Sequence, residues 1–365
     1  MIPVLTPAAS AELDAASSEP IEVLVRRAGR AVATAALSLL GGSYGRRVVV
    51  VAGPGNNGAD GRVAAELLER RGVKVRVVEA SGATTPGFRL GPADLVIDAA
   101  FGTGLRSEVI FPDVDGAPVL AVDIPSGIDG LTGAARGAPP RAVATVTFVA
   151  PAPGLLLGEG PRYAGEVIVA DIGLDPGTPR IALVEDADVV AWVPHRSVDD
   201  HKWRHAVWLV AGSPGMRGAA WLSAAAAMRG GAGYLRCSSP DGRPECPIEA
   251  VAVELSAESW AEQVVDGAER FACVAIGPGL GRGDTVAEGV RDVVRRAAVP
   301  VVVDGDGLTA LGREAASLLS ERRAATVLTP HDGEFEALTG APPGADRIDA
   351  ARRLAAATAA VVLLK

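Results

Sequence analysis

The sequence VVVVAGPGNNGADG, residues 48–61, constrains the fold of this chain more than any other stretch. Four consecutive valines predict a short strand that is buried on both faces, as in a parallel sheet. Gly53, Gly55 and Gly58 then predict a turn in which the backbone can approach a ligand closely. Asp60 is a good N-cap for the amphipathic segment GRVAAELLERRG. Strand, glycine turn and helix together predict an α/β domain with a pocket suited to anion binding at the carboxyl end of a strand.

The same turn gathers polar side chains. Asn56, Asn57 and Asp60 place two amides and a carboxylate within five residues. The alternative, a Rossmann-like turn without chemistry of its own, does not need such groups. The turn is therefore interpreted as part of a binding site.

The composition supports an α/β protein that is large enough for two domains. Of the 365 residues, 48% are hydrophobic and only 4% aromatic, so the cores must consist of Val, Leu, Ala and Ile. The net charge of −9 argues against non-specific nucleic-acid binding. The sequence begins without the basic and apolar regions of a signal peptide, and no apolar run approaches the roughly 20 residues of a membrane span. The three cysteines form no CxxC motif, which fits a reducing cytoplasm. From the charge and the lack of a membrane span, we expect neither nucleic acid nor membrane as partner.

Polar residues follow three of the strands predicted in the first half. Strands are expected at 48–51 and 73–78 and within ADLVIDAA, PVLAVD, ATVTFVAP and GEVIVADIG. Beyond the turn at 56–60, the polar groups are Asp98, the Gly102-Thr103-Gly104 turn, Asp123 and Ser126. In an open α/β sheet, ligands bind at the carboxyl edge near a reversal of strand order. We therefore predict residues 1–177 as one domain, 178–200 as a connecting segment and 201–365 as a second α/β domain.

Asn57, Asp98 and Ser126 each offer an oxygen after a different strand, and hard cations prefer oxygen ligands. With one carboxylate and no His or Cys, this set suits a monovalent ion better than zinc. On spacing alone, Asp98 and Ser126 could equally cap helices or turns.

Asp123 ends an apolar strand, where a partly desolvated carboxylate can act as acid or base. Hydrogen bonding of Asp123 to nearby backbone amides is an equally good interpretation. The turn at 102–104 offers backbone donors to a phosphate.

The second half repeats the pattern of strand, glycine turn and helix. Gly277-Pro-Gly-Leu-Gly281 follows one predicted strand and His331 follows another, within TPHDGEF. A single histidine is most often structural, but its place directly after a strand favours a site.

These residues carry a resemblance that covers essentially the whole chain. GPGNNGADG, VIDAAFGTGL, VDIPSGIDG and FVAPAPGLLLGEG resemble the NAD(P)H-hydrate epimerase domain. GSPGMRGAAWLSAAAAMRGGAGY, AIGPGLG, VVVDGDGLTAL and TPHDGEFEALTG resemble ADP-dependent NAD(P)H-hydrate dehydratase. The order matches the family of bifunctional nicotinamide-nucleotide repair enzymes. The resemblance implies an N-terminal Rossmann-like three-layer αβα domain and a C-terminal, incomplete ribokinase-like α/β domain.

The resemblance also implies the chemistry. The substrate would be NADH or NADPH that has gained water across the nicotinamide C5–C6 bond. The first domain would interconvert the R and S forms at C6, and the second would dehydrate the S form with ADP or ATP, and with magnesium. Asp123 is expected as the acid/base of the first reaction. The other implied site residues are Asn56, Asn57, Gly58, Ala59, Asp60, Gly102, Thr103, Gly104, Leu105, Arg106, Ser107, Glu108 and Asp123 for the hydrate in the first domain, Asn57, Asp98 and Ser126 for potassium, Ala219, Gly279 and His331 for the hydrate in the second domain, and Lys365 for the nucleotide.

The sequence departs from the family pattern at several positions. The usual Ala-Pro-Lys-Pro-Gly has Ala152 in place of lysine, the usual Met-Glu is Val25-Arg26, and Asp332 replaces a proline. The Gly-Thr-Gly-Asp loop of the dehydratase would lie beyond Lys365, so we expect little or no dehydratase activity from these residues. We also expect a homo-oligomer, because the helix predicted from Ile21 has an alanine-rich face.

Three other functions are weighed against cofactor repair. A Rossmann oxidoreductase is disfavoured because GPGNNG lacks the GxGxxG spacing and only Glu79 stands near the usual ribose position. A sugar or vitamin kinase is disfavoured by the missing phosphate loop. A non-catalytic scaffold protein stays open.

Overall fold

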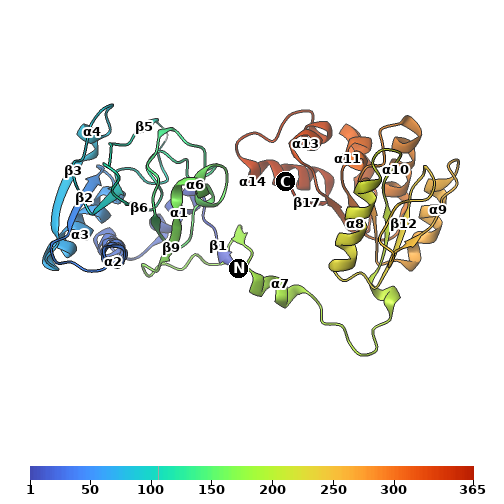
Figure 1. The fold of residues 1–365 in the computed structure, drawn as a ribbon, viewed down its shortest axis with the longest axis horizontal. Helices are drawn as coiled ribbons and strands as arrows, with labels where there is room; N and C mark the ends of the chain where they lie inside the picture. The colour runs from blue at the N-terminus through green and yellow to red at the C-terminus, as the bar shows by residue number, and fades with distance from the viewer. Residues whose placement is uncertain (106) are drawn as a thin grey trace. The chain divides into compact units, whose positions relative to one another are not determined.

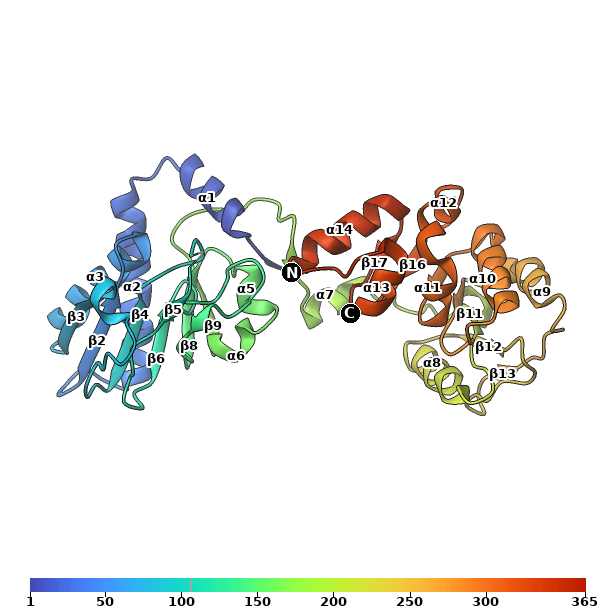
Figure 2. The same ribbon diagram turned by 90° about the horizontal axis from the view of Figure 1, so that it is seen from above.

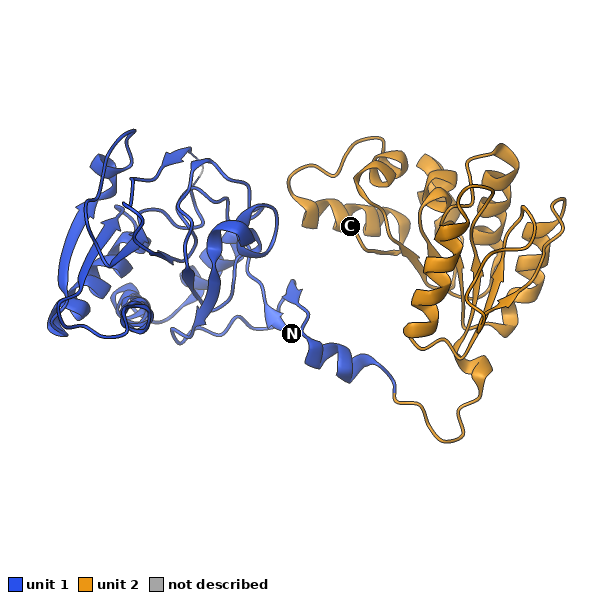
Figure 3. Cartoon of the chain, in the orientation of Figure 1, with its two compact units in different colours: residues 1–194 blue, residues 195–365 orange. Residues whose placement is uncertain are grey.

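The computed structural model describes residues 1–105 and 107–365. The chain forms two compact units, Met1–Pro194 and His195–Lys365 (Figure 3). The division falls inside the segment 178–200. Each unit is described by itself.

The first unit contains seven helices and ten strands among its described residues (Figure 1). The helices are α1 (Pro7–Ala16), α2 (Ile21–Leu40), α3 (Asn56–Arg70), α4 (Ala80–Ala83), α5 (Pro153–Leu156), α6 (Gly160–Ala164) and α7 (Asp186–Trp192). The strands are β1 (Ile2–Pro3), β2 (Arg47–Ala52), β3 (Lys74–Glu79), β4 (Leu95–Ala99), β5 (Val109–Ile110), β6 (Val119–Val122), β7 (Gly137–Ala138), β8 (Ala144–Phe148), β9 (Glu166–Ala170) and β10 (Ala182–Leu183).

Six strands form a parallel sheet in the order β3-β2-β4-β6-β8-β9. The valines of β2 alternate between its faces, as strand geometry requires. Val48 and Val50 pack with α2 and α3, whereas Val49 and Val51 pack with α4 and the segments around it. The first strand of this sheet along the chain, β2, lies between β3 and β4, so the order reverses between β2 and β4.

Helix α1 has a place of its own in this unit. Strand β1 pairs antiparallel with β10, and the Thr6 hydroxyl then caps the helix by accepting a hydrogen bond from the Ala9 N–H at 3.1 Å. None of the α1 residues is buried. Figure 2 shows α1 beyond one end of the sheet strands. The helix is therefore held at its start without contributing to the core.

The glycine turn after β2 differs from the prediction in one respect. Helix α3 begins at Asn56 with Gly55 as its N-cap, so Asp60 lies inside the helix and is not its cap. The prediction failed because the segment NNGADG is itself helical. Gly53 and Gly58 are required here, since a Cβ on either would lie 1.8 Å from a backbone oxygen, of Ala100 and of Gly53 respectively. The turn is thus pressed against the segment that follows β4.

The second unit contains a seven-stranded sheet among its described residues. Its helices are η1 (Lys202–His205), α8 (Arg217–Arg229), α9 (Trp260–Gly267), η2 (Ala268–Arg270), α10 (Asp284–Arg296), α11 (Asp306–Leu311), η3 (Gly312–Glu314), α12 (Ala315–Ser320), α13 (Asp332–Thr339) and α14 (Arg347–Thr358), where η marks a 3₁₀ helix. Its strands are β11 (Ala206–Val210), β12 (Tyr234–Ser238), β13 (Val251–Ala252), β14 (Cys273–Ile276), β15 (Val301–Val303), β16 (Thr326–Leu328) and β17 (Val361–Val362).

All pairings in this sheet are parallel, in the order β13-β12-β11-β14-β15-β16-β17. One face packs against α9 to α14 and the other against α8. The strand order reverses between β11 and β14, as it does between β2 and β4 in the first unit. The prediction of two α/β domains with parallel sheets is confirmed. Across the described residues, no helix has both the length and the apolar character needed to cross a membrane.

Candidate active sites

The carboxyl ends of β2, β4 and β6 open into one cavity of about 720 Å³. It lies at the reversal of strand order, where ligands bind in open α/β sheets. The cavity is lined by Ser10, Leu13 and Asp14 of α1; Ile21, Leu24, Val25 and Ala28 of α2; Pro54, Gly55, Asn56, Asn57 and Asp60; Ala100, Phe101, Gly102, Thr103, Gly104 and Leu105; and Asp123, Phe148, Val149 and Ile172.

Asp98 and Ser126 are joined directly, and both are fully buried. The Ser126 hydroxyl donates to Asp98 Oδ1 at 2.6 Å, and the Ser126 N–H donates to Asp98 Oδ2 at 2.7 Å. Burial raises the pKa of Asp98 to about 6, against the hydrogen bonds from Ser126 and Ala100, which lower it. Since this pair contains no positive charge, the carboxylate lacks the counter-charge that burial demands.

Asn57 is the third residue of the predicted cation site. Its amide nitrogen and oxygen are both buried, and neither has a hydrogen-bond partner among the described residues. Its side chain lies beside Gly102, because a Cβ on Gly102 would be 3.7 Å from Asn57 Cβ and Cγ. An unpartnered buried amide costs free energy unless a ligand satisfies it.

The segment 100–102 connects these three residues. The Ala100 N–H donates to Asp98 Oδ1 at 3.2 Å, the Phe101 N–H donates to Ser126 Oγ at 2.9 Å, and Gly102 contacts Asn57. The buried Asp98 carboxylate, which has no counter-charge, and the unpartnered Asn57 amide oxygen are oxygen ligands of the kind that bind a monovalent cation. The residues present therefore suit a monovalent cation.

Asp123 stands directly after β6 with a φ of 66°, in the left-handed region that few residues other than glycine occupy. Its backbone is fixed by a hydrogen bond from its N–H to the Val146 oxygen at 2.7 Å. Its Oδ2 accepts from the Thr103 N–H at 3.0 Å. Burial raises the pKa of Asp123, hydrogen bonds from Thr103 and Thr147 lower it, and the charge of Asp14 raises it. The fold thus holds a strained, half-buried carboxylate on the cavity wall.

Two further carboxylates line the cavity. Asp60, on the second turn of α3, is 6% exposed, and burial together with the charges of Asp123 and Asp14 raises its pKa to about 8. Asp14 comes from α1, and the sequence reasoning did not identify it. The signal was present: Ser10, Leu13 and Asp14 are spaced i, i+3 and i+4 on a predicted helix and therefore share one face.

The structure places most of the predicted hydrate-binding residues of the first unit on this cavity. Asn56, Asn57, Asp60, Asp123 and residues 102–105 line it. Among the described residues, Gly58, Ala59, Ser107 and Glu108 are outside the lining. Arg106 lies outside the described residues.

Glu79, the candidate ribose ligand of the oxidoreductase alternative, is already engaged. Both oxygens of its carboxylate accept from Arg62 Nη2, at 2.8 and 2.7 Å. The other terminal nitrogen of Arg62 donates to the Gly53 oxygen at 2.9 Å. The pair ties the end of β3 to the glycine turn, so its role here is structural.

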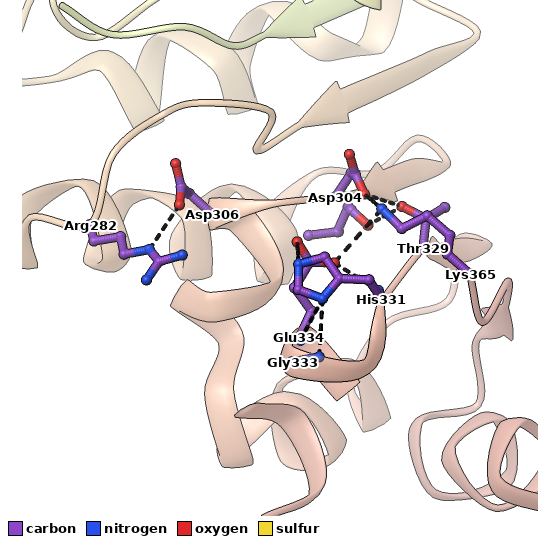
Figure 4. A network of polar contacts seen from close by, with 9 residues as sticks. Arg282, Asp304, Asp306, Thr329, His331, Gly333, Glu334 and Lys365 are labelled. Carbon is purple, nitrogen blue, oxygen red and sulfur yellow. Dashed lines mark hydrogen bonds and ion pairs between the residues drawn. The ribbon is translucent and has the colours of Figure 1, made fainter. Parts of the chain in front are cut away.

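In the second unit, polar side chains meet at the carboxyl edge of β15, β16 and β17 (Figure 4). Asp304 Oδ1 accepts from Lys365 Nζ at 2.7 Å and from the Thr329 hydroxyl at 2.6 Å. Burial alone would raise the pKa of Asp304, but these two hydrogen bonds bring it below its usual value. Lys365 Nζ also lies 3.7 Å from the buried Glu334 carboxylate.

His331 caps helix α13 in this cluster. Its Nδ1 accepts from the Gly333 N–H at 3.0 Å and from the Glu334 N–H at 3.3 Å, and Glu334 returns the bond by accepting from the His331 N–H at 2.9 Å. This is a capping box. Nε2 lies 3.2 Å from Glu334 Oε1, and the side chain is 59% exposed. The histidine therefore has a structural function, through the bonds drawn in Figure 4, although most of its side chain is exposed.

Ala219 and Gly279, predicted to share a site, are in contact. A Cβ on Gly279 would lie 2.8 Å from the Ala219 Cβ. The glycine loop after β14, residues 277–281, is fixed by hydrogen bonds to two other segments. The Gly212 N–H donates to the Pro278 oxygen at 2.9 Å, and the Gly281 N–H donates to Asp306 Oδ2 at 2.9 Å. This loop lies where the strand order reverses.

Comparison with known proteins decides the family. Residues 207–365 match the family NAD(P)H-hydrate dehydratase, and residues 21–87 and 79–154 match the family YjeF-related protein N-terminus. The bifunctional NAD(P)H-hydrate repair enzyme Nnr of Salinibacter ruber is 35% identical over 100% of this chain and 80% of its own length. This chain belongs to the bifunctional NAD(P)H-hydrate repair enzyme family.

Other members of this repair enzyme family show the same extent of similarity. The enzymes of Thermofilum pendens and Mycobacterium tuberculosis (strain H37Rv) are 36% and 37% identical over 94% and 98% of this chain, and 75% and 78% of their own. The solved ADP/ATP-dependent NAD(P)H-hydrate dehydratase from Bacillus subtilis is 31% identical, with a TM-score of 0.41, over 50% of this chain and 65% of that protein. The family expected from the sequence motifs is confirmed.

Proposed function

We propose that the first unit of this repair enzyme epimerises hydrated NADH and NADPH at C6 of the nicotinamide ring. The proposal rests on the position and conformation of Asp123. Its carboxylate lies on the wall of a cavity large enough for a nicotinamide nucleoside, and its backbone conformation is strained. Strain of this kind is retained mainly where function requires it.

The proposed chemistry needs an acid/base and a shielded cavity. The C6–O bond breaks with its electron pair on oxygen, and the N1 lone pair forms a double bond to C6. A proton from Asp123 converts the departing hydroxide into water. Water then adds to the other face of C6 and returns a proton to the carboxylate. Because burial raises the pKa of Asp123, its proton is available at a higher pH than that of an exposed aspartate.

Asn57, Asp98 and Ser126 are proposed to hold potassium. Bound potassium would supply a positive charge that balances Asp98 and a ligand for the orphaned Asn57 amide oxygen. Asn57 follows β2, Asp98 lies near the end of β4 and Ser126 follows β6, so their contacts position the three loops that carry the substrate-lining residues.

The second unit is proposed to bind the S hydrate together with ADP or ATP and magnesium, for nucleotide-dependent dehydration. Its support is the match of residues 207–365 to the dehydratase family and the contact of Ala219 with Gly279 at the reversal of strand order. Lys365 is proposed to contact the nucleotide. The homo-oligomer and the cytoplasmic location stay predictions.

The proposal is tested with purified protein and a single epimer of hydrated NADH. Chiral separation after incubation should show equilibration of the R and S forms in potassium chloride, and none with the Asp123→Asn variant. A kinase would instead transfer phosphate from a nucleotide, and a scaffold protein would leave the epimer unchanged. Unchanged stereochemistry with the folded wild-type protein would refute the proposed epimerase.

A further inference from the structure

Helix α1 presents one face to the cavity of the first unit. Ser10, Leu13 and Asp14 line the cavity, although no residue of the helix is buried. The start of the helix is fixed by the Thr6 cap and by a hydrogen bond from the Leu5 N–H to the Pro151 oxygen at 3.1 Å. The helix therefore forms part of the cavity wall and contributes nothing to the core.

Asp14 is placed where it does not stabilise its own helix. It lies in the last turn of α1, where the partial negative charge of the helix terminus disfavours a carboxylate. No hydrogen bond or ion pair joins its side chain to another described residue. Its charge raises the pKa of both Asp60 and Asp123. Asp14 is exposed, so water can solvate its charge, and what distinguishes it from Glu12 on the same helix is its place on the cavity wall.

The wall of the cavity is acidic throughout. Its charged lining residues are Asp14, Asp60 and Asp123, and no Lys, Arg or His is among the described lining residues. Asp60 is 94% buried, as its 6% exposure shows, and its carboxylate has no hydrogen bond or ion pair within the part of the chain that the structure describes. In addition to burial, negative charge on one of these groups disfavours ionisation of the others, as the raised pKa of Asp60 and of Asp123 shows, and a positively charged occupant would relieve this repulsion.

The proposed epimerisation supplies such an occupant. When the C6–O bond breaks and the N1 lone pair forms the N1–C6 double bond, the neutral ring becomes a cation. Fixed negative charge that faces a developing positive charge lowers the barrier, because the protein does not have to reorganise during the step.

We propose that Asp14 of helix α1 is a catalytic residue of the epimerase site and stabilises the positively charged nicotinamide ring that forms when the C6 hydroxyl leaves. This inference rests on the proposed function. It assigns the reaction's electrostatic stabilisation to the N-terminal helix, while proton transfer stays with Asp123.

The first test compares Asp14→Asn with Glu12→Gln. Both variants remove one exposed carboxylate from the same helix, but only Asp14 lines the cavity. Asp14→Asn should lower kcat of epimerisation about tenfold or more, with KM changed less than about threefold. Asp14→Asn should also raise Tm slightly, because a carboxylate leaves the helix C-terminus. Glu12→Gln should keep wild-type kcat. Equal kcat for the two variants, with an active wild type, would overturn the role of Asp14 and leave the epimerase proposal standing.

A second test does not depend on epimerase activity. NAD⁺ carries a positive charge on its nicotinamide ring and NADH does not, so titration calorimetry of both ligands measures the preference of the cavity for a ring cation. The Gly102→Leu variant measures how much of either ligand binds outside this cavity. The leucine should block the cavity, since even a Cβ at this position would lie 2.8 Å from Asp123 Oδ2. Above this background, the wild type should prefer NAD⁺, and Asp14→Asn should reduce that preference about fivefold. An unchanged preference would overturn the inference. If the wild type is inactive, the epimerase proposal and the catalytic role of Asp14 both fail, whereas an active wild type with an unchanged preference overturns the role of Asp14 alone.

Discussion

Ser126 donates two hydrogen bonds to a single carboxylate, that of Asp98: its hydroxyl to Oδ1 at 2.6 Å and its backbone N–H to Oδ2 at 2.7 Å. The two residues are 28 positions apart, and Asp98 lies in β4 whereas Ser126 follows the neighbouring strand β6. The Ser126 hydroxyl oxygen also accepts from the Phe101 N–H. One side chain thus connects the loops after β4 and β6, which form the base of the cavity.

Replacement of Ser126 by alanine should destabilise the first unit. The change removes the hydroxyl that donates to Asp98 and the oxygen that accepts from Phe101, and leaves both groups buried. We expect the free energy of unfolding to fall by about 1–3 kcal/mol. Urea denaturation at neutral pH measures this, with the exposed Ser81→Ala as the control. A loss no larger than that of Ser81→Ala would show that the pair contributes little.

Potassium should stabilise the protein through Asp98. If the ion balances this buried carboxylate, the wild-type Tm should rise in potassium chloride relative to choline chloride at equal ionic strength. Asp98→Asn removes the charge and should abolish the difference. The Tm measured by calorimetry in the two salts tests this. A potassium-dependent rise that persists in Asp98→Asn would place the ion elsewhere.

Asp60 should make stability fall as the pH rises. Its pKa is about 8 in the folded state against an ordinary value of 3.8, so between these pH values the folded state binds more protons than the unfolded state. The free energy of unfolding therefore decreases with rising pH across this window, by an amount on the order of a few kcal/mol. Asp60→Asn should flatten this dependence in denaturation curves between pH 5 and about 9. Parallel curves for variant and wild type would contradict the assignment.

Asp123→Asn should abolish epimerisation while leaving the fold intact. Asparagine adopts a positive φ more readily than most residues, so the backbone at 66° should be retained. Loss of the acid/base should lower kcat by about 100-fold or more. The exposed Asp113→Asn is the matched control. Full activity of Asp123→Asn in the chiral assay would transfer the proton-transfer role to another residue.

Lys365→Met should weaken nucleotide binding by the second unit. In the structure its ammonium contacts Asp304 and lies near Glu334, so its positive charge offsets these two carboxylates. Without it, the two carboxylates would repel nucleotide phosphates, and we expect the Kd for ADP to rise about tenfold. Titration calorimetry measures this, with Lys74→Met in the first unit as the control. Equal affinities in both variants would exclude Lys365 as a nucleotide contact.

The strands and the sheet edge of each site could be predicted because they depend on local pattern. The four valines and the glycine turn place β2 and α3, and polar residues after successive strands identify the edge that binds. The resemblance implies that Ala219 and Gly279 both contact the hydrate, and the structure brings these two residues together, although their role stays a prediction.

What could not be predicted depends on contacts between distant segments. Asp14 is an ordinary helix residue until the chain places α1 against the cavity. Asp60 looked like an N-cap because Asp before an apolar run usually is one, whereas the helix starts four residues earlier, at Asn56. The pairing of Arg62 with Glu79 is equally invisible in sequence, since its residues lie 17 positions apart on a helix and a strand.

The close approach of Gly53 and Ala100 has a consequence for engineering. Where these main-chain segments touch, the backbone sets the shape of the cavity. Side-chain substitutions selected by directed evolution can therefore change that part of the cavity very little. The wall contributed by α1 and α2 consists instead of side chains, Ser10, Leu13, Ile21 and Val25 among them. Libraries that seek activity on other hydrated heterocycles should vary that wall and keep the glycine turn invariant.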